Sequence, residues 1–407
     1  MLLFCVVGNA QSLPTEAVFG KFKDRLVQIR IIDTLTDAQS TIGSGFFIDK
    51  YGTIITNYHV ISKHIFKPEQ YRIEYVMHDA RVFPAQLVNI DVVHDLAILD
   101  GKQIVTPHLN LIDHSIRKGE RIYTLGNPLD LGMTIVESTY NGLTDDTMHE
   151  RIMLSGALNP GMSGGPSIME DGTVIGVNVA ATGANIGFLV PAVFLNKLVP
   201  HDYKPGAINF VELVRKQLLE NQNEYMHALL ASPFKSKTLG DYAVPDKLAS
   251  YLNCWGDTDD ENKPYRGSST ICAIKNDIFL NQHFSTGEIR YSHHYFSASN
   301  MNSYRFYNLM QQYFANPSVT LSGNKEDVTE FNCTTDFVEH AQLRFKVAFC
   351  LREYKKIKGI YDMVLNAATI NETQQGLVTT LTLGGISYDN AVAFGKEYLR
   401  TFKWNRP

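Results

Sequence analysis

Charged residues are scarce in this chain. Asp, Glu, Lys and Arg make up 19% of its 407 residues, against about 25% in an average globular protein. The formal net charge is -5, with no basic surplus and no long run of one sign, so neither nucleic-acid binding nor a polyelectrolyte tail is expected. No stretch of about 20 apolar residues follows the N-terminus, so no membrane-spanning helix is expected there.

The chain also lacks internal repeats and low-complexity segments. Hydrophobic residues make up 44% of it, and at about 150 residues per domain its length predicts two or three domains. We divide it into residues 15–200, a linker and helix over 201–234, and a second domain over 235–407. The first domain is rich in short strands between Gly, Asn and Asp turns, which predicts an all-β sandwich or barrel.

The second domain mixes strands and helices, so we expect an α+β fold. Helix-like spacing of apolar residues first appears over Asn209–Leu230, just after the linker His201–Gly206. Similar patterns predict helices over Ser303–Phe314, Tyr354–Ala368 and Tyr388–Thr401. Extended patterns predict strands over Phe279–Tyr291, Leu343–Leu351 and Leu377–Leu383.

Cysteine is infrequent and unevenly placed. Four of the five cysteines lie in the C-terminal half, and their short separations favour local bridges, Cys254–Cys272 and Cys333–Cys350. Each bridge would stabilise the fold by about 3 kcal/mol. The alternative is four reduced, buried cysteines in a cytosolic domain. No Cys-x-x-Cys pair occurs, so no zinc site is expected.

The N-terminus favours export. An apolar run over residues 2–7 is followed by Gly8-Asn9-Ala10, which is typical of the end of a secretory signal, here residues 1–10. The run is short and has no basic leader, so a buried strand remains the alternative. Disulfides need an oxidising compartment, and the two features together predict a periplasmic or secreted protein.

Three segments of the first domain carry a histidine, an aspartate and a serine in that order. They are GTIITNYHVI with His59, HDLAIL with Asp95 and NPGMSGGP with Ser163. Each alone is typical of an ordinary turn or strand end, but together they supply a nucleophile, a base and an acid. We expect Ser163 to attack a carbonyl, His59 to take and return its proton, and Asp95 to hold the imidazole.

The glycines around Ser163 indicate an oxyanion hole. Negative charge that develops on the attacked carbonyl needs preorganised donors, and we expect the N–H groups of Gly161 and Ser163 to supply them. Pro160 restricts the chain that enters the turn, and the glycines permit its tight geometry.

Seven ordered segments within residues 25–195 resemble the protease domain of the HtrA/Deg family of trypsin-like serine peptidases. They are GSGFFID, GTIITNYHVI, HDLAIL, LGNPLDLGMT, ALNPGMSGGP, GTVIGVNVA and IGFLVP. The resemblance implies a chymotrypsin-like fold of two six-stranded β-barrels, with His59 and Asp95 on the first and Ser163 on the second. It implies protein or peptide substrates and a serine endopeptidase that needs neither metal nor cofactor.

The chain departs from that family in two places. Met162 stands where the family usually has Asn, which leaves open whether the oxyanion hole is preformed. No Gly-Leu-Gly-Phe-like loop follows residue 205, so a PDZ domain is not expected. These departures motivate an alternative function, a binding or chaperone-like module on a protease scaffold with weak or no turnover.

The substrate pocket should be small and apolar. By resemblance it is lined by residues that precede the nucleophile and by a later strand, namely Ala157, Leu158, Asn178, Val179, Ala180 and Ala181. No acidic residue is among them, so we expect small aliphatic side chains before the scissile bond rather than Lys or Arg.

Overall fold

The computed structural model describes residues 12–405 except 103–106, 113–114, 182–184, 200–207, 260–262, 275–276 and 299. The predicted signal, the linker 201–206 and the side chains of Ala180 and Ala181 lie outside the described residues. The chain divides into two compact units, the first Met1–Thr144 with Glu150–Ala207 and the second Asp145–His149 with Ile208–Pro407. Within the described ranges, no helix has the length and apolar character that crossing a membrane requires.

The first unit begins with a seven-stranded antiparallel sheet of order β5-β4-β1-β2-β3-β7-β6. Helix α2 (Tyr58–Phe66) follows β3 directly. The strands are β1 (Leu26–Asp33), β2 (Ala38–Phe47), β3 (Thr53–Thr56), β4 (Tyr71–Met77), β5 (Val82–Pro84), β6 (Gln86–Asp91) and β7 (Leu96–Asp100).

A closed six-stranded barrel of order β10-β13-β12-β11-β8-β9 completes the first unit. Phe46 of β2 and Leu125 and Val177 of the barrel share one hydrophobic core. Helices α1 (Thr15–Phe22) and α3 (Leu195–Leu198) flank the strands in sequence. The strands are β8 (Arg121–Gly126), β9 (Thr134–Leu143), β10 (Ile152–Ser155), β11 (Pro166–Ile168), β12 (Val174–Ala181) and β13 (Ile186–Pro191).

The chymotrypsin-like fold class is confirmed, with one difference. The resemblance implied two closed six-stranded barrels, whereas the first sheet has seven strands and, among the described residues, no pairing between its edge strands β5 and β6. Edge strand β5 has three residues and ends at Pro84, which has no N–H to donate to a further ladder.

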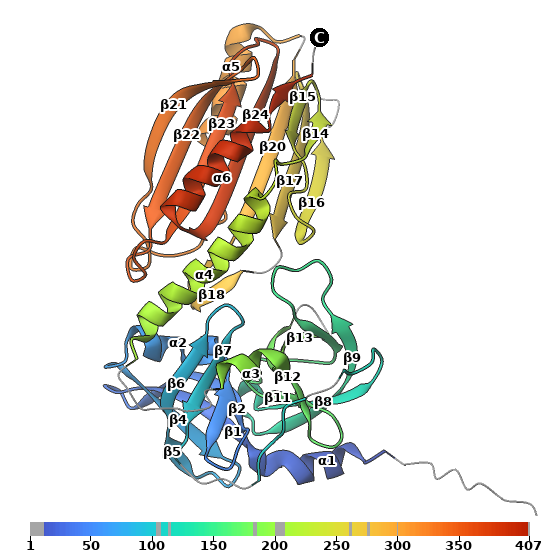
Figure 1. Cartoon of the computed structure of the whole chain (residues 1–407), viewed down its shortest axis with the longest axis vertical. Helices are drawn as coiled ribbons and strands as arrows, with labels where there is room; N and C mark the ends of the chain where they lie inside the picture. Colours follow the sequence, from blue (N-terminus) through green and yellow to red (C-terminus); the bar gives the residue numbers. More distant parts are fainter. Residues whose placement is uncertain are drawn as a thin grey trace, which may run out of the picture. The chain divides into compact units, whose positions relative to one another are not determined.

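The second unit is mostly sheet. Its seven-stranded antiparallel sheet has the order β16-β17-β20-β24-β23-β22-β21 (Figure 1). Its strands are β16 (Leu252–Thr258), β17 (Arg266–Ile274), β20 (Ile289–Ser297), β21 (Asn332–His340), β22 (Leu343–Glu353), β23 (Tyr361–Thr369) and β24 (Gln375–Ile386). Smaller sheets contain β14 (Ser236–Leu239), β15 (Tyr242–Pro245), β18 (Ile278–Asn281), β19 (Phe284–Thr286) and β25 (Lys403–Trp404).

Helices pack on both faces of that sheet. Helices α4 (Phe210–Leu230) and α6 (Tyr388–Arg400) contribute Met226 and Phe394 to the core of one face. Helix α5 (Ser303–Ala315) packs Phe306 and Met310 against the other. These three helices were predicted, but the fourth predicted helix, Tyr354–Ala368, is wrong because β23 occupies its second half and no helix lies in the rest.

Both predicted cysteine pairings are present as disulfides, Cys254–Cys272 and Cys333–Cys350. Each joins residues that lie directly opposite in neighbouring antiparallel strands, β16 with β17 and β21 with β22. The bridges therefore fix the register of the two outermost strand pairs of the sheet.

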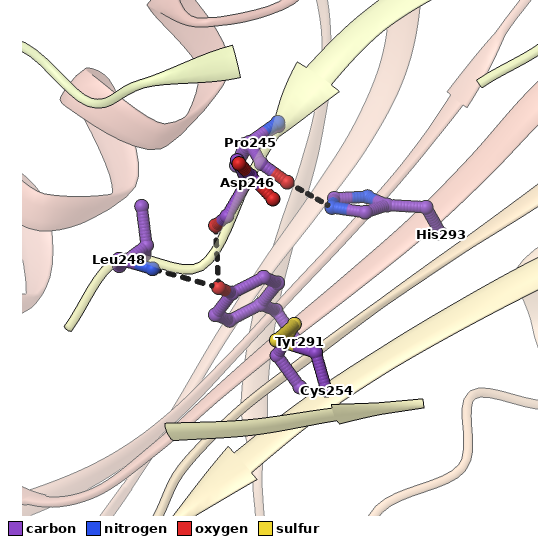
Figure 2. Close-up of a disulfide and its surroundings, with 7 residues drawn as sticks. Pro245, Asp246, Leu248, Cys254, Tyr291 and His293 are labelled. Carbon is purple, nitrogen blue, oxygen red and sulfur yellow. Dashed lines mark hydrogen bonds between the residues drawn. A yellow bond between two sulfur atoms is a disulfide. The ribbon is translucent and has the colours of Figure 1, made fainter. Parts of the chain in front are cut away.

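His293 lies buried near the first disulfide (Figure 2). Its Nε2 lies 3.2 Å from the carbonyl of Pro245, and its Nδ1 lies 3.0 Å from Thr379 Oγ1. Because a carbonyl can only accept, Nε2 carries the proton of the neutral ring. Burial, which outweighs the hydrogen bond to Pro245, and the charge of Lys237 lower the pKa of His293 from 6.5 to about 3.

Acid is therefore expected to destabilise the second unit through His293. Below pH 6.5 the imidazole of His293 binds a proton in the unfolded chain but stays neutral in the folded one. The free energy of unfolding therefore falls by about 1.4 kcal/mol for each pH unit until the folded pKa is reached. His293→Gln should reduce that slope between pH 6 and 4. Urea unfolding followed by tryptophan fluorescence measures it, since both tryptophans, Trp255 and Trp404, lie in this unit.

The matched control is His283→Gln, which changes an exposed histidine of the same unit. It should leave the wild-type slope intact. Equal slopes for wild type and His293→Gln would contradict the role given to the buried ring.

Candidate active site

His59 and Asp95 form a hydrogen-bonded pair at the candidate site. His59 is the second residue of α2, and Asp95 precedes β7 with a φ of 65°, a left-handed conformation that Asp tolerates better than most residues. Asp95 Oδ1 accepts the backbone N–H of His59 at 2.8 Å, and Oδ2 lies 2.7 Å from His59 Nδ1. The side chain of Asn57 donates to the Asp95 carbonyl at 2.7 Å, so the aspartate is fixed at both ends.

This pairing determines the protonation of the imidazole. A carboxylate accepts a proton at Nδ1, which leaves Nε2 as the basic nitrogen. Burial of His59 is the largest influence and acts to lower its pKa, but the charge of Asp95 and the hydrogen bond to it together outweigh burial. The pKa of His59 is therefore raised above 6.5.

Ser163 lies in a loop that approaches the end of β3 and the start of α2. A side chain on the next residue, Gly164, would meet Thr56 Oγ1 at 2.3 Å and Asn57 N at 3.0 Å. Residues 159–165, here called the serine loop, therefore pack against the residues that lead into α2. Ser163 Oγ donates to the carbonyl of Val179 at 3.1 Å. That carbonyl is available because the β12–β13 register shifts between Asn178 and Ala180, which takes Val179 out of the ladder.

The carbonyls that precede Ser163 are held by the protein. Pro160 O accepts the N–H of Leu129 at 2.8 Å, and Gly161 O accepts Ser44 Oγ at 2.7 Å. Gly161 has a φ of 96°, and a side chain there would lie 2.4 Å from Asn127 O. Only glycine fits this position without strain.

The next two carbonyls are held as well. Met162 O accepts Gly165 N at 3.1 Å and Asn178 Nδ2 at 3.3 Å. Ser163 O accepts Ser44 N at 2.7 Å. Met162 itself is buried at 1% exposure, so its side chain does not lie at the loop surface.

The N–H groups of Gly161 and Ser163 are oriented by these carbonyls. In a trans peptide the N–H points opposite to the preceding C=O, and the carbonyls of Pro160 and Met162 point toward protein donors. Among the described residues, neither N–H has a hydrogen-bond acceptor. Each N–H therefore points away from the donor that holds the carbonyl of its own peptide.

A cavity of about 360 Å³ opens beside Ser163. Of the predicted pocket residues, Leu158, Asn178 and Val179 line it, whereas Ala157 is exposed and is not part of its lining. The remaining lining residues are Asn159, Pro160, Met162 and Ser163.

The amide of Asn178 is fully used within the protein. Its Nδ2 donates to Leu125 O at 2.9 Å and to Met162 O, and its Oδ1 accepts Ser167 Oγ at 2.9 Å. Asn178 therefore shapes the cavity and has little capacity left for a substrate.

Sequence reasoning missed Ser44, which contacts the loop through both its backbone and its side chain. The signal that could have found it is its place between Gly43 and Gly45. A side chain at 43 would lie 3.2 Å from Ser163 O, and one at 45 would lie 2.9 Å from Ile55 O. Such crowding marks a strand segment that other backbone approaches closely.

Comparison with known proteins covers the same part of the chain. Residues 43–177 match the family model described as a trypsin-like peptidase domain. The chain contains a trypsin-like peptidase domain. The match begins at Gly43 and includes His59, Asp95 and Ser163.

Curated relatives of the domain bear HtrA and DegP names, which confirms the resemblance. The chain is 30% identical over 178 residues to a probable periplasmic serine endoprotease DegP-like of Chlamydia pneumoniae, covering 41% of this chain and 35% of the relative. It is 32% identical over 210 residues to the mitochondrial serine protease HTRA2 of Drosophila willistoni, covering 47% and 48%. The chain thus spans from one third to one half of these relatives.

A solved structure is also similar to part of this chain. It is the serine endoprotease from Yersinia pestis, at 24% identity and a TM-score of 0.40, covering 46% of this chain and 65% of that one.

Proposed function

We propose that this chain is a serine endopeptidase that hydrolyses peptide bonds in unfolded proteins. The observation that carries the proposal is the imidazole–carboxylate pair of His59 and Asp95, with Nδ1 and Oδ2 2.7 Å apart. The same domain holds Ser163 in a loop whose N–H groups at 161 and 163 have no hydrogen-bond acceptor among the described residues. These are the nucleophile, base, orienting acid and oxyanion donors that acyl transfer requires.

Acylation begins at Ser163. Its hydroxyl leaves Val179 O and turns toward the imidazole. His59 Nε2 accepts the proton as Oγ bonds to the substrate carbonyl carbon, and Asp95 stabilises the imidazolium that forms. His59 then gives the proton to the leaving amine, and the peptide C–N bond breaks.

The Gly161 and Ser163 N–H groups stabilise the oxyanion in this step. The donors that hold the carbonyls of Pro160 and Met162 are already in place without substrate, so little reorganisation is needed during the reaction. Water then attacks the acyl-enzyme, with His59 again as base, and releases the acid with Ser163 restored. Met162 is compatible with a preformed hole because it is buried and its carbonyl is held by Asn178.

The cavity beside Ser163 favours small aliphatic side chains before the scissile bond. Leu158, Met162 and Val179 line it with apolar side chains, and the amide of Asn178 is occupied by two backbone carbonyls and the Ser167 hydroxyl. No acidic side chain lines the cavity among the described residues, so a lysine or arginine would lose its solvation without a counter-charge.

We infer an oxidising compartment, periplasmic or extracellular. The two disulfides support this location, as do the periplasmic names of several relatives. Four free thiols at these positions in protein isolated from its native source would contradict it.

Digestion of unfolded casein by the full chain tests the proposal. We expect internal cuts after Val, Ala or Leu, identified by mass spectrometry of the peptides. Predominant cutting after Lys or Arg would overturn the pocket assignment. Binding of casein without any cutting would overturn the endopeptidase and favour a binding module.

A further inference from the structure

Ser44 is a buried strand residue with an unusual set of partners. It lies on β2 and is 1% exposed. Its Oγ donates to Gly161 O at 2.7 Å and accepts the N–H of Asn127 at 2.9 Å. Its N–H donates to Ser163 O at 2.7 Å, and its carbonyl accepts Thr56 Oγ1 at 2.8 Å.

These bonds join three separate parts of the domain. Ser44 belongs to the first sheet, Gly161 and Ser163 to the serine loop, and Asn127 to the segment after β8. The segment after β8 also supplies the Leu129 N–H that holds Pro160 O. One hydroxyl therefore ties the serine loop to the segment that supports it.

The fit around the hydroxyl leaves little freedom. A side chain on Gly126 would lie 3.1 Å from Ser44 Oγ, and one on Gly164 would lie 2.2 Å from Ser44 O. Glycine at both positions lets the serine loop and the β8 end close on Ser44 from two sides.

We propose that Ser44 is the positioning residue of the oxyanion hole. Its hydroxyl holds the Asn127 N–H and the Gly161 carbonyl, and so fixes the segment whose Leu129 N–H holds Pro160 O. Pro160 O lies opposite the Gly161 N–H in their shared trans peptide, so the Gly161 N–H is held where charge develops in the transition state. This role rests on the proposed peptidase function, because it has no purpose without an oxyanion.

The physical reason is the cost of unpaired buried groups. Without the hydroxyl, Gly161 O and Asn127 N both lose a partner in a buried place, and each would pay a desolvation penalty. Rotation of the loop peptides recovers partners for them, and glycine at 161 offers little resistance to that rotation. When the segment after β8 shifts, Pro160 O loses the Leu129 N–H that orients its peptide, and the Gly161 N–H turns away from the oxyanion.

Ser44→Ala tests the proposal in the full chain. The backbone bond to Ser163 O stays, while the hydroxyl is lost. Losing an oxyanion donor costs about 10²–10³ in kcat, so a misplaced donor is expected to lower kcat by about 10- to 100-fold. KM for a peptide substrate should stay within about twofold. Affinity for a peptide boronic acid, which forms a tetrahedral adduct on Ser163, should fall by the same factor as kcat.

The matched control is Ser138→Ala. Ser138 is a buried strand serine of the same domain whose contacts to Thr124 and Val136 are long, at 3.5 Å. It should keep wild-type kcat and boronate affinity. Ser44→Cys keeps the bulk with a weaker donor and should lose less kcat than Ser44→Ala. If Ser44→Ala does not fold, the kcat and boronate affinity of Ser44→Cys test the proposal in its place.

The outcomes separate this proposal from the function it rests on. A wild type that neither cleaves peptides nor reacts with a fluorophosphonate probe would contradict the proposed peptidase function. An active wild type with Ser44→Ala within twofold in kcat and boronate affinity overturns the role of Ser44 alone. A loss confined to KM overturns it as well, since that would be ordinary damage to substrate binding.

Discussion

Ser163→Ala is expected to lower kcat for peptide hydrolysis by about 10⁶, the order of loss that follows removal of a catalytic serine. The change removes the oxygen that bonds to the substrate carbonyl. It leaves the His59–Asp95 pair, 2.7 Å apart, and the Gly161 N–H in place, so KM should change little. A fluorogenic peptide with valine before the scissile bond measures both constants.

A covalent probe supplies the control for that experiment. A fluorophosphonate should label the wild type and Ser138→Ala, and it should not label Ser163→Ala. Circular dichroism should show the same fold for all three. Labelling of Ser163→Ala, or a fall in kcat of less than tenfold, would mean that another group is the nucleophile.

The sequence allowed the triad to be predicted because its signals are local. The glycine-rich octapeptide around Ser163 and the strand end before His59 each place one side chain with few possible geometries. The positive φ of Asp95 and the helix N-terminus at His59 then bring carboxylate and imidazole together. Chain order and local signals were therefore enough to predict these residues. The structure contains the His59–Asp95 pair, and the role of Ser163 stays a prediction.

Ser44 could not be predicted in the same way. Its side-chain partners, Gly161 and Asn127, lie 117 and 83 residues away in the sequence. A serine hydroxyl serves many roles, so its type alone carries little information. Only packing of the first sheet against the barrel shows which backbone groups it meets.

The one wrong helix has a physical explanation. The predicted helix Tyr354–Ala368 is largely β23, and almost every residue of that strand is buried. A strand buried on both faces shows no alternation of polar and apolar residues, so its period cannot be distinguished from that of a buried helix. The helices that were predicted correctly, such as α5, each keep one exposed face.

Asp95→Asn is expected to lower kcat at neutral pH by about 10⁴. Asp95 accepts two N–H groups, the His59 backbone at 2.8 Å and Nδ1 at 2.7 Å. An asparagine can accept only one of them through its oxygen, and it presents an NH₂ group to the other. If the backbone bond is kept, the NH₂ group faces Nδ1 and drives the ring proton to Nε2, where it blocks transfer from Ser163.

The pH profile should shift in a defined direction. His59 works as a base only when neutral, so kcat/KM of the wild type should rise with pH and reach half its maximum above pH 6.5, because the pKa of His59 is raised. Asp95→Asn removes the charge and the hydrogen bond that raise it and leaves burial, which lowers it. The midpoint of the variant should therefore lie below pH 6.5.

The chain offers a closely matched control in His94 and Asp91. Asp91 Oδ2 lies 2.7 Å from His94 Nδ1, and Asp91 Oδ1 accepts the His94 N–H at 2.9 Å. Asp91→Asn breaks an equivalent pair on the same sheet that has no proposed part in catalysis, and it should change kcat less than about fivefold with the midpoint unmoved. If both variants lost activity equally, the loss would reflect damage to the β6–β7 turn, and the orienting role of Asp95 would have to be abandoned.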